Sequence, residues 1–327
     1  CRTIEGKQDV LERYFPGHWV LKQGTILTSP VSPESTVINC AVVNNTLFNM
    51  TEYRDIDNGH LPPYLLLIPF DSEGNKLWYE SEFVRLTSVN TNTKQITVDR
   101  GQLYSTPKNF TSGTYIAALP GQIISQQPLF FYNMASTCPV DLNGKKASDL
   151  YVEELSSYFN RGNGLLKNFN GIAFDVNYFD VSNSPNFDVN NDGIADGGII
   201  NGVNLWREGN WEMLRNLRQK LGNEYIISAD GHHATNQQAV GILNGIESEG
   251  LVQHNDAWRG ISRTLNTHLY WRNFNETEYY FSYVVLKFMH DNDASAQHIN
   301  RLTRSGIATA VCLKAHLANY QIGRASC

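Results

Sequence analysis

The sequence has no long apolar run and no surplus of basic residues. None of its hydrophobic stretches approaches the roughly 18–20 residues of a membrane-spanning helix, so no membrane span is expected. The 26 Lys and Arg residues against 32 Asp and Glu leave a net charge of −6, which gives no basic surface for nucleic acid. The motifs G-x-G-x-x-G, G-x-x-x-x-G-K-[ST] and G-x-S-x-G are also missing, so no dinucleotide site, phosphate-binding loop or serine-hydrolase nucleophile is indicated.

Cysteines are few, namely Cys1, Cys40, Cys138, Cys312 and Cys327. No two of them form a C-x-x-C pair, so a cysteine zinc site is not expected. The four N-x-[ST] sequons would suit a secreted glycoprotein, although composition alone accounts for about that number. A chain that begins at Cys1 rather than Met resembles a processed one. With its low Lys content and abundant Asn, Tyr and Trp, the sequence favours a secreted or extracellular protein with disulfides.

The chain divides by pattern into three segments. Residues 1–23 are expected to form a lead-in and the first strand of the main domain, at 18–22. Residues 24–119 show β patterns throughout, with a hairpin loop at 90–94, and predict a small antiparallel β module. Residues 120–327 alternate between strand and helix patterns.

The alternating segment predicts a parallel sheet with helices on its faces. Strands are expected at 128–133, 171–175, 225–229, 245–249, 279–288 and 307–315, with helices near 148–159, 210–222, 258–265 and 299–306. Polar residues end several of these strands, and no dinucleotide motif opens a helix. Both observations favour a (β/α)8-type TIM barrel over a doubly wound sheet. About six or seven strands are countable, so one or two are hidden or absent.

Three carboxylates at strand ends predict the chemistry. Two strands carry the same phrase, N-G-I-x-x-[DE], which ends at Asp175 in one and at Glu249 in the other. Asp230 ends the strand between them, and Glu247 lies on the same strand face as Glu249 and competes for its role. Paired carboxylates are the groups that hydrolyse glycosidic bonds. The alternative is that these acids cap helices or hold loops.

Several aromatic and polar side chains are candidates for contacting a sugar. Aromatic rings stack on sugar rings, although burial in the core is the commoner role of such residues. A histidine after a strand end is more often a loop residue than a catalytic one. The candidates for substrate binding are Tyr132, Asn133, Asn177, Tyr178, Trp206, His232 and Trp258, with Trp271 as a further stacking candidate.

The stretch from Asp188 to Asp196 matches the calcium-loop pattern D-x-[DN]-x-[DN]-G. Oxygen ligands would come from the side chains of Asp188, Asn190, Asp192 and Asp196 and from the carbonyl of Ile194. The twelfth loop position is Ile199 rather than Glu, which argues against an EF-hand. The pattern predicts a structural Ca²⁺, and the alternative is an ordinary polar turn rich in Asn, Asp and Gly.

The strand ending in Asp175, the loop after it and the later G-I-x-x-E strand resemble extracellular TIM-barrel glycoside hydrolases of the endo-polygalactosaminidase-like group. Further similar segments are 98–102, 113–117, 214–222 and 304–310. The resemblance extends over most of the chain from about residue 18. It implies a glycan substrate and the acidic pair Asp175 and Glu249. The chain departs from the group by stopping soon after Ala315, where a further strand would be expected.

The sequence leaves a second class of function open. A non-catalytic structural or glycan-binding subunit on a degenerate glycosidase barrel would also carry these features. Cysteines stand at both ends of the chain, and with five in total at least one is free or links to another copy. Head-to-tail links that do not close would build filaments.

Overall fold

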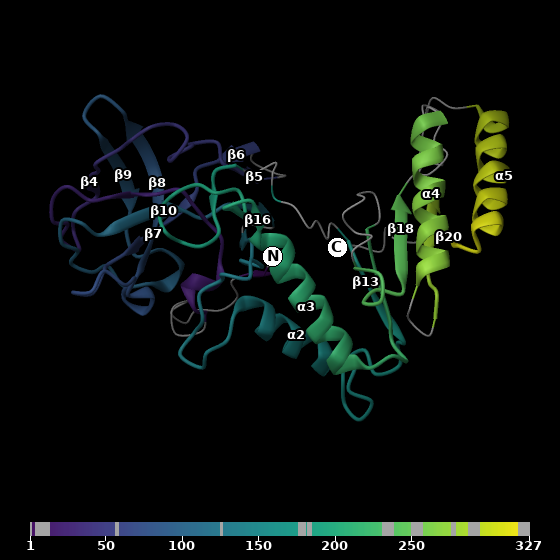
Figure 1. Cartoon of the computed structure of the whole chain (residues 1–327). Helices are drawn as coiled ribbons and strands as arrows, with labels where there is room; N and C mark the ends of the chain where they lie inside the picture. The colour runs from purple at the N-terminus through teal and green to yellow at the C-terminus, as the bar shows by residue number, and fades with distance from the viewer. Residues whose placement is uncertain are drawn as a thin grey trace. The chain divides into compact units, whose positions relative to one another are not determined.

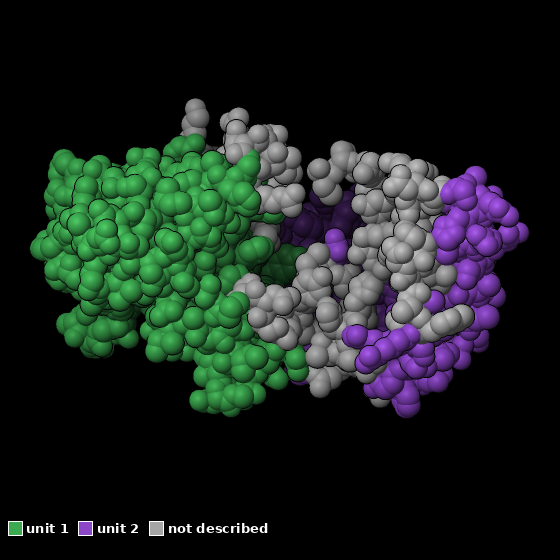
Figure 2. Space-filling model, turned by 90° about the horizontal axis from the view of Figure 1, so that it is seen from above, with its two compact units in different colours: residues 1–151, 180–210 green, residues 152–179, 211–327 purple. Residues whose placement is uncertain are grey.

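The computed structural model describes residues 2–3, 14–55, 59–124, 127–175, 181, 185–230, 239–249, 258–275, 279–286 and 295–319. The chain divides into two compact units. Unit 1 contains residues 1–151 and 180–210, and unit 2 contains residues 152–179 and 211–327 (Figure 2). The division falls within two helices, α2 (Ala147–Tyr158) and α3 (Leu205–Leu221).

Unit 1 contains a six-stranded antiparallel sheet, most of whose strands are labelled in Figure 1. Its order is β3 (Thr25–Ile26), β10 (Tyr115–Ala118), β7 (Tyr64–Ile68), β8 (Glu82–Asn90), β9 (Gln95–Asp99) and β4 (Val37–Asn39). The strands β8 and β9 form the hairpin that the sequence predicts, with its loop between Asn90 and Gln95. Antiparallel pairing throughout this sheet is what the β module of residues 24–119 leads one to expect.

The central strand β7 shows why this sheet is stable. All five of its residues are buried. Leu65 and Leu67 pack into one hydrophobic cluster, whereas Leu66 and Ile68 pack into another. Successive side chains of a strand point to opposite faces, so the continuous apolar run fills the cores on both sides of the sheet.

Unit 1 also contains short strands, turns and 3₁₀ helices. A five-stranded sheet has the order β1 (Arg2–Thr3), β12 (Gln127–Phe130), β11 (Gly121–Ile124), β5 (Tyr53–Asp55) and β6 (Gly59–Leu61). Two further pairs are β2 (Leu21–Lys22) with β14 (Phe187–Asp188), and β15 (Ile199–Ile200) with β16 (Val203–Asn204). The 3₁₀ helices are η1 (Pro16–His18), η2 (Trp78–Glu80) and η3 (Gln102–Tyr104).

Unit 2 contains a five-stranded parallel sheet. Its order follows the chain: β13 (Gly171–Phe174), β17 (Ile226–Asp230), β18 (Gly245–Glu249), β19 (Tyr283–Leu286) and β20 (His316–Asn319). The helices α4 (Trp258–Phe274) and α5 (Ala296–Leu313) lie side by side (Figure 1). The helix α4 packs against β18, and α5 packs against β19 and β20. The contact between α5 and β19 is apolar and includes Leu313 of the helix and Val284 of the strand.

The (β/α)8 barrel predicted from the sequence is wrong. The described parallel sheet has five strands, with β13 and β20 as its edges. The stretch expected as a barrel strand at 128–133 instead forms β12, which pairs antiparallel with β11. The expected first barrel strand contributes β2, which pairs antiparallel with β14. An apolar run indicates a buried strand but not its partner. For β12, the partner β11 is adjacent in sequence and closes a short loop at low entropic cost.

The C-terminal part of the predicted pattern is also corrected. Gly306 does not end a helix, and 307–315 is not a strand, because α5 continues to Leu313. The side chain of Ser295 accepts from the backbone N–H of His298 and so caps the start of α5, and Lys314 ends the helix in a left-handed conformation with φ 54°. Gly306 is buried, and packing offsets the roughly 1 kcal/mol that a glycine costs inside a helix. No helix among the described residues is long and apolar enough to cross a membrane.

Candidate functional site

The predicted calcium loop begins at the end of β14, in unit 1. The carboxylate of Asp188 is fully buried. Its Oδ1 accepts from the backbone N–H of Asp192 at 3.0 Å, and its Oδ2 accepts from that of Gly193 at 2.7 Å. Gly193 has φ +94°, a conformation that favours glycine. The loop therefore folds back over the Asp188 carboxylate.

The other predicted calcium ligands also bond within the loop. Asp192 accepts from the backbone N–H of Ile194 at 2.8 Å and from the Asn190 side chain at 2.9 Å. Asp196 accepts from two backbone N–H groups, at 2.6 and 3.1 Å. In the part of the chain that the structure describes, no three His, Cys, Asp or Glu side chains form a group that could hold a metal. A Ca²⁺ would require these oxygens to turn toward one point, and the calcium site stays a prediction.

A lysine from another part of unit 1 lies beside this loop. The ammonium group of Lys76 donates to the backbone carbonyl of Asn191. It lies 4.3 Å from the ring centroid of Tyr115, 5.8 Å from that of Phe70 and 5.9 Å from that of Trp78. These distances are within the range of cation–π contacts. The loop is therefore bordered by a positive charge that is surrounded by aromatic rings.

Burial shifts the ionisation of this cluster. Burial raises the pKa of Asp188 to about 6, although the N–H of Gly193 and the Lys76 charge oppose the shift. Burial lowers the pKa of Lys76, while the carboxylates of Asp188 and Asp192 oppose that shift. Burial also raises the pKa of Tyr115, whose hydroxyl donates to Asp188 at 3.5 Å. The Lys76 side chain therefore lies near two acidic side chains, those of Asp188 and Asp192.

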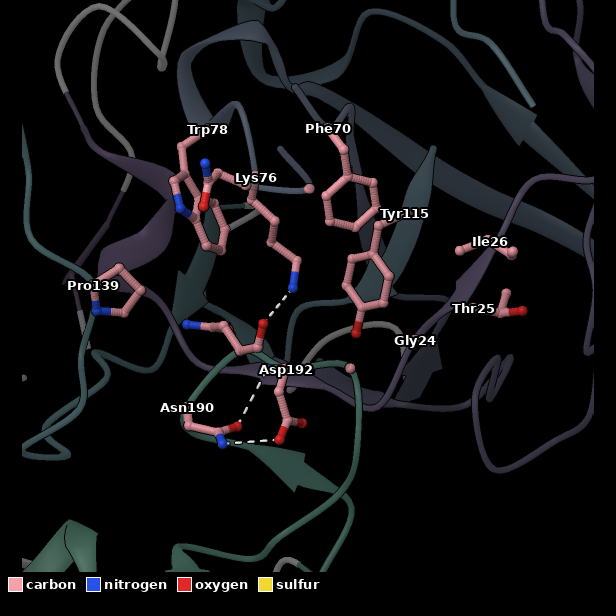
Figure 3. A pocket seen from close by; sticks show the side chains of 14 residues that line it. Gly24, Thr25, Ile26, Phe70, Lys76, Trp78, Tyr115, Pro139, Asn190 and Asp192 are labelled. Atoms are coloured by element: carbon pink, nitrogen blue, oxygen red, sulfur yellow. Dashed lines mark hydrogen bonds between the residues drawn. The ribbon is translucent and has the colours of Figure 1, made fainter. Parts of the chain in front are cut away.

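Lys76, Tyr115 and Asp192 line a pocket of about 630 Å³, which we call the loop pocket. Figure 3 shows Trp78 and Pro139 on one side of the Lys76 side chain and Phe70 and Tyr115 on the other, with the loop 190–193 beyond its end. Its volume is within the range of small-molecule sites. The side chain of Asn191 is 7% exposed and lines the pocket, and neither polar atom of its amide has a hydrogen-bond partner.

The predicted catalytic acids belong to the parallel sheet of unit 2. Asp230 is the last residue of β17 and stands in register with Glu247 on β18. Asp175 directly follows β13, is exposed, and comes level with Asp230 because Phe174 pairs with Ala229. The structure thus places Asp175, Asp230 and Glu247, which we call the acid row, at one level of three neighbouring strands.

The same level continues across the sheet with other polar residues. Glu247 is in register with Tyr283, which is in register with His316. The hydroxyl of Tyr283 donates to Oε2 of Glu247 at 2.7 Å. Ser248, which lies between the two acids of β18, is buried. Its Oγ is 2.7 Å from Nε2 of His268 in α4. Since neighbouring strand residues point to opposite faces, Glu247 is on the face away from α4.

The register separates the acid pair that the sequence favours. Glu249 stands in register with Val285, two residues along β18 from the acid row. Asp175 and Glu249 are on strands with β17 between them. Two strand spacings and two residues place their backbones about 12 Å apart. The neighbouring acids Asp230 and Glu247 are about 4.8 Å apart by the same spacing.

The structure places three of the predicted substrate-binding residues in unit 1. Tyr132 is half-buried, with its ring 6.3 Å from that of Tyr151. Asn133 is buried and donates to the carbonyl of Val189 at 2.8 Å. Trp206 packs against a cluster around Val189. Trp271, the further stacking candidate, is fully buried. Asn177, Tyr178 and His232 lie outside the described residues, and Trp258 begins α4 without a described side chain.

No motif in the sequence indicates the aromatic side of the loop pocket. Four residues on this side are far from residues 190–193 in the sequence and share no motif with them, namely Phe70, Lys76, Trp78 and Tyr115. A cluster of aromatic residues around a turn, at 70–79, was the available signal. It is a weak one because aromatic residues on strands usually fill the core.

The cysteines that the structure describes do not form disulfides. Cys40 and Cys138 are buried free thiols, and Cys312 is an exposed one. Burial raises the pKa of both the Cys40 and the Cys138 thiol to about 12. These two thiols are therefore poor nucleophiles at neutral pH. Cys1 and Cys327 lie outside the described residues.

Comparison with protein-family models finds no family that matches this chain, and comparison with curated proteins finds no match.

Proposed function

We propose that this protein is an extracellular glycoside hydrolase whose catalytic carboxyl groups belong to the acid row of unit 2. The observation that carries the proposal is the register of Asp230 with Glu247 on the next parallel strand. Glycoside hydrolysis needs two carboxyl groups that flank the glycosidic bond. In open parallel α/β sheets, ligands bind outside the carboxyl ends of the strands, and Asp230 is the last residue of its strand.

The spacing favours one pair over the others. Carboxyl groups are about 5–5.5 Å apart in retaining glycosidases and about 6.5–9.5 Å apart in inverting ones. The backbones of Asp230 and Glu247 are one strand spacing apart, about 4.8 Å, which is compatible with the carboxyl separation of the retaining class. The backbones of Asp175 and Glu249 are about 12 Å apart, so their side chains would have to converge to bring the carboxyl groups into either range. The pair Asp230 and Glu247 is therefore the better candidate, with Asp175 beside it for binding the substrate.

The hydrogen bond from Tyr283 assigns the roles. A hydroxyl that donates to a carboxylate favours its ionised form, so Glu247 suits the nucleophile. Asp230, in its acid form, protonates the glycosidic oxygen while Glu247 attacks the anomeric carbon. The carbon–oxygen bond breaks, and a glycosyl ester forms on Glu247. Asp230, now ionised, takes a proton from water, which attacks the same carbon and releases the sugar and the Glu247 carboxylate.

Isosteric variants test this proposal. Asp230→Asn and Glu247→Gln should lower the release of reducing sugar from a polysaccharide panel by about 10²–10⁴-fold, with unchanged melting temperatures. Asp99→Asn is a matched control because Asp99 is an exposed acid at the end of β9. Azide should restore activity to Glu247→Ala but not to Asp175→Asn. Full activity of the Glu247→Gln variant would contradict the assignment.

The loop pocket favours a second candidate function, glycan binding without hydrolysis. Its aromatic rings and amide side chains are groups that hold a sugar. A chain that binds polysaccharide but releases no sugar from any member of the panel would support this function against the first.

Assembly through cysteines stays a prediction. On non-reducing electrophoresis, a ladder of covalent oligomers that collapses with reductant would support cysteine-linked subunits. A single monomer band in both lanes would exclude disulfide-linked filaments.

A further inference from the structure

We propose that the loop pocket of unit 1 binds a neutral saccharide. The residues concerned are not those of the acid row, so the site would be retained even if the chain hydrolyses nothing. The proposal rests on three properties of the pocket: its aromatic walls, its charge, and a buried amide without a partner.

The walls suit the apolar face of a sugar ring. Trp78 is half-buried and Phe70 is 37% exposed, so both rings have surface to offer a ligand. Tyr115 is buried, and its ring lies against the backbone at Gly24, where an added Cβ would come within 2.5 Å of the ring. This close packing holds the Tyr115 ring in place as part of the wall. The volume of about 630 Å³ is large enough for one or two sugar rings.

The charge of the pocket excludes anionic ligands. The ammonium group of Lys76 is the cation of the cluster, and it already donates to the carbonyl of Asn191. It interacts with two carboxylates, those of Asp188 and Asp192. A phosphate or a uronic acid would meet more negative than positive charge here, whereas a neutral ligand avoids this repulsion.

The buried amide of Asn191 indicates hydroxyl groups on the ligand. An amide that is 7% exposed with neither polar atom paired is uncommon in a folded protein. A sugar hydroxyl both donates and accepts, so neighbouring hydroxyls would satisfy the amide oxygen and the amide N–H₂ together. The exposed carboxylate of Asp192, at the same rim of the pocket, offers a further acceptor.

The test is a binding titration of the full chain, by calorimetry and ligand-observed NMR. The neutral probes are cellobiose, lactose and N,N′-diacetylchitobiose, and the anionic probes are galacturonic acid and inorganic phosphate. Trp78→Ala should weaken binding of a neutral probe about tenfold or more. Tyr79→Ala is its control, because both rings lie near Phe15 but only Trp78 lines the pocket.

A second variant removes the amide without disturbing the backbone. Asn191 has φ +59°, which glycine adopts freely, so Asn191→Gly should stay folded and lose binding. Asn201→Gly is the matched control, because Asn201 has φ +51° on an exposed turn. Repeating the titrations with Glu247→Gln separates this site from hydrolysis. Absence of binding by all neutral probes, binding of the anionic probes alone, or equal affinities in each variant and its control would overturn the proposal.

Discussion

Replacement of Glu82 by Gln should strongly destabilise the six-stranded sheet of unit 1. The Glu82 side chain is fully buried at the start of β8. Its carboxylate accepts from Nε and Nη2 of Arg100 at 2.8 and 2.7 Å and from the backbone N–H groups of Gly101 and Lys108, both at 2.9 Å. Arg100 also donates to carbonyls in the 32–35 loop at 2.6 and 3.0 Å. This buried pair therefore joins four segments of the unit.

The size of the destabilisation follows from the hydrogen-bond donors from which a Gln amide nitrogen cannot accept. Its N–H₂ group would face either Arg100 Nε and the Gly101 N–H or Arg100 Nη2 and the Lys108 N–H, all of which are donors. A buried unpaired polar group costs about 1–3 kcal/mol. Removing one partner of a buried ion pair costs about 3–5 kcal/mol in total. We expect a loss of about 3–5 kcal/mol, a large part of the roughly 5–15 kcal/mol that stabilises a typical domain.

Chemical denaturation of the wild type, Glu82→Gln, Arg100→Met and the double variant measures this loss. The double variant should be less destabilised than the sum of the single variants, because the second change removes the charge left unpaired by the first. Glu80→Gln is the control, since Glu80 forms an exposed pair with Lys108 at 3.4 Å and should lose at most about 1 kcal/mol. A loss for Glu82→Gln below about 1 kcal/mol would refute the reasoning.

Three further predictions concern the sites and pH. Tyr283→Phe removes the hydroxyl that holds Glu247 and should lower kcat about tenfold or more with little change in KM, in a hydrolysis assay with the same substrates. EGTA should lower the melting temperature if the loop 188–196 binds Ca²⁺, because an ion that binds only the folded chain stabilises it. Burial lowers the pKa of His18 below 6.5, so stability should fall as pH drops below about 6.5. The stability of the His18→Gln variant should fall less than that of the wild type in parallel thermal melts. Equal losses of stability would contradict this prediction.

Local structure was predictable where neighbouring residues decide it. The phrase N-G-I-x-x-[DE] predicts two strands, and both are present, as β13 and β18. Gly222, with φ +87° after α3, ends the helix as the sequence predicts. The helix expected from about residue 210 begins instead at Leu205, because the side chain of Asn204 accepts the N–H of Arg207 and caps the helix there. Several Asn residues near the start of α3 are equally suitable N-cap residues, and tertiary packing selects among them.

The pairing of each strand with its neighbour was not predictable from the residue pattern of that strand alone. The sequence by itself determined a β module, buried strands and acids at their ends. Only the tertiary structure decided that β12 pairs antiparallel with β11, and that Asp230 rather than Asp175 stands beside Glu247. It also decided that Lys76 lies against the Asn190–Gly193 loop, 115 residues from its partner Asn191. Hydrophobic periodicity reports which side of an element is buried, whereas register and long-range contacts depend on how all elements pack together.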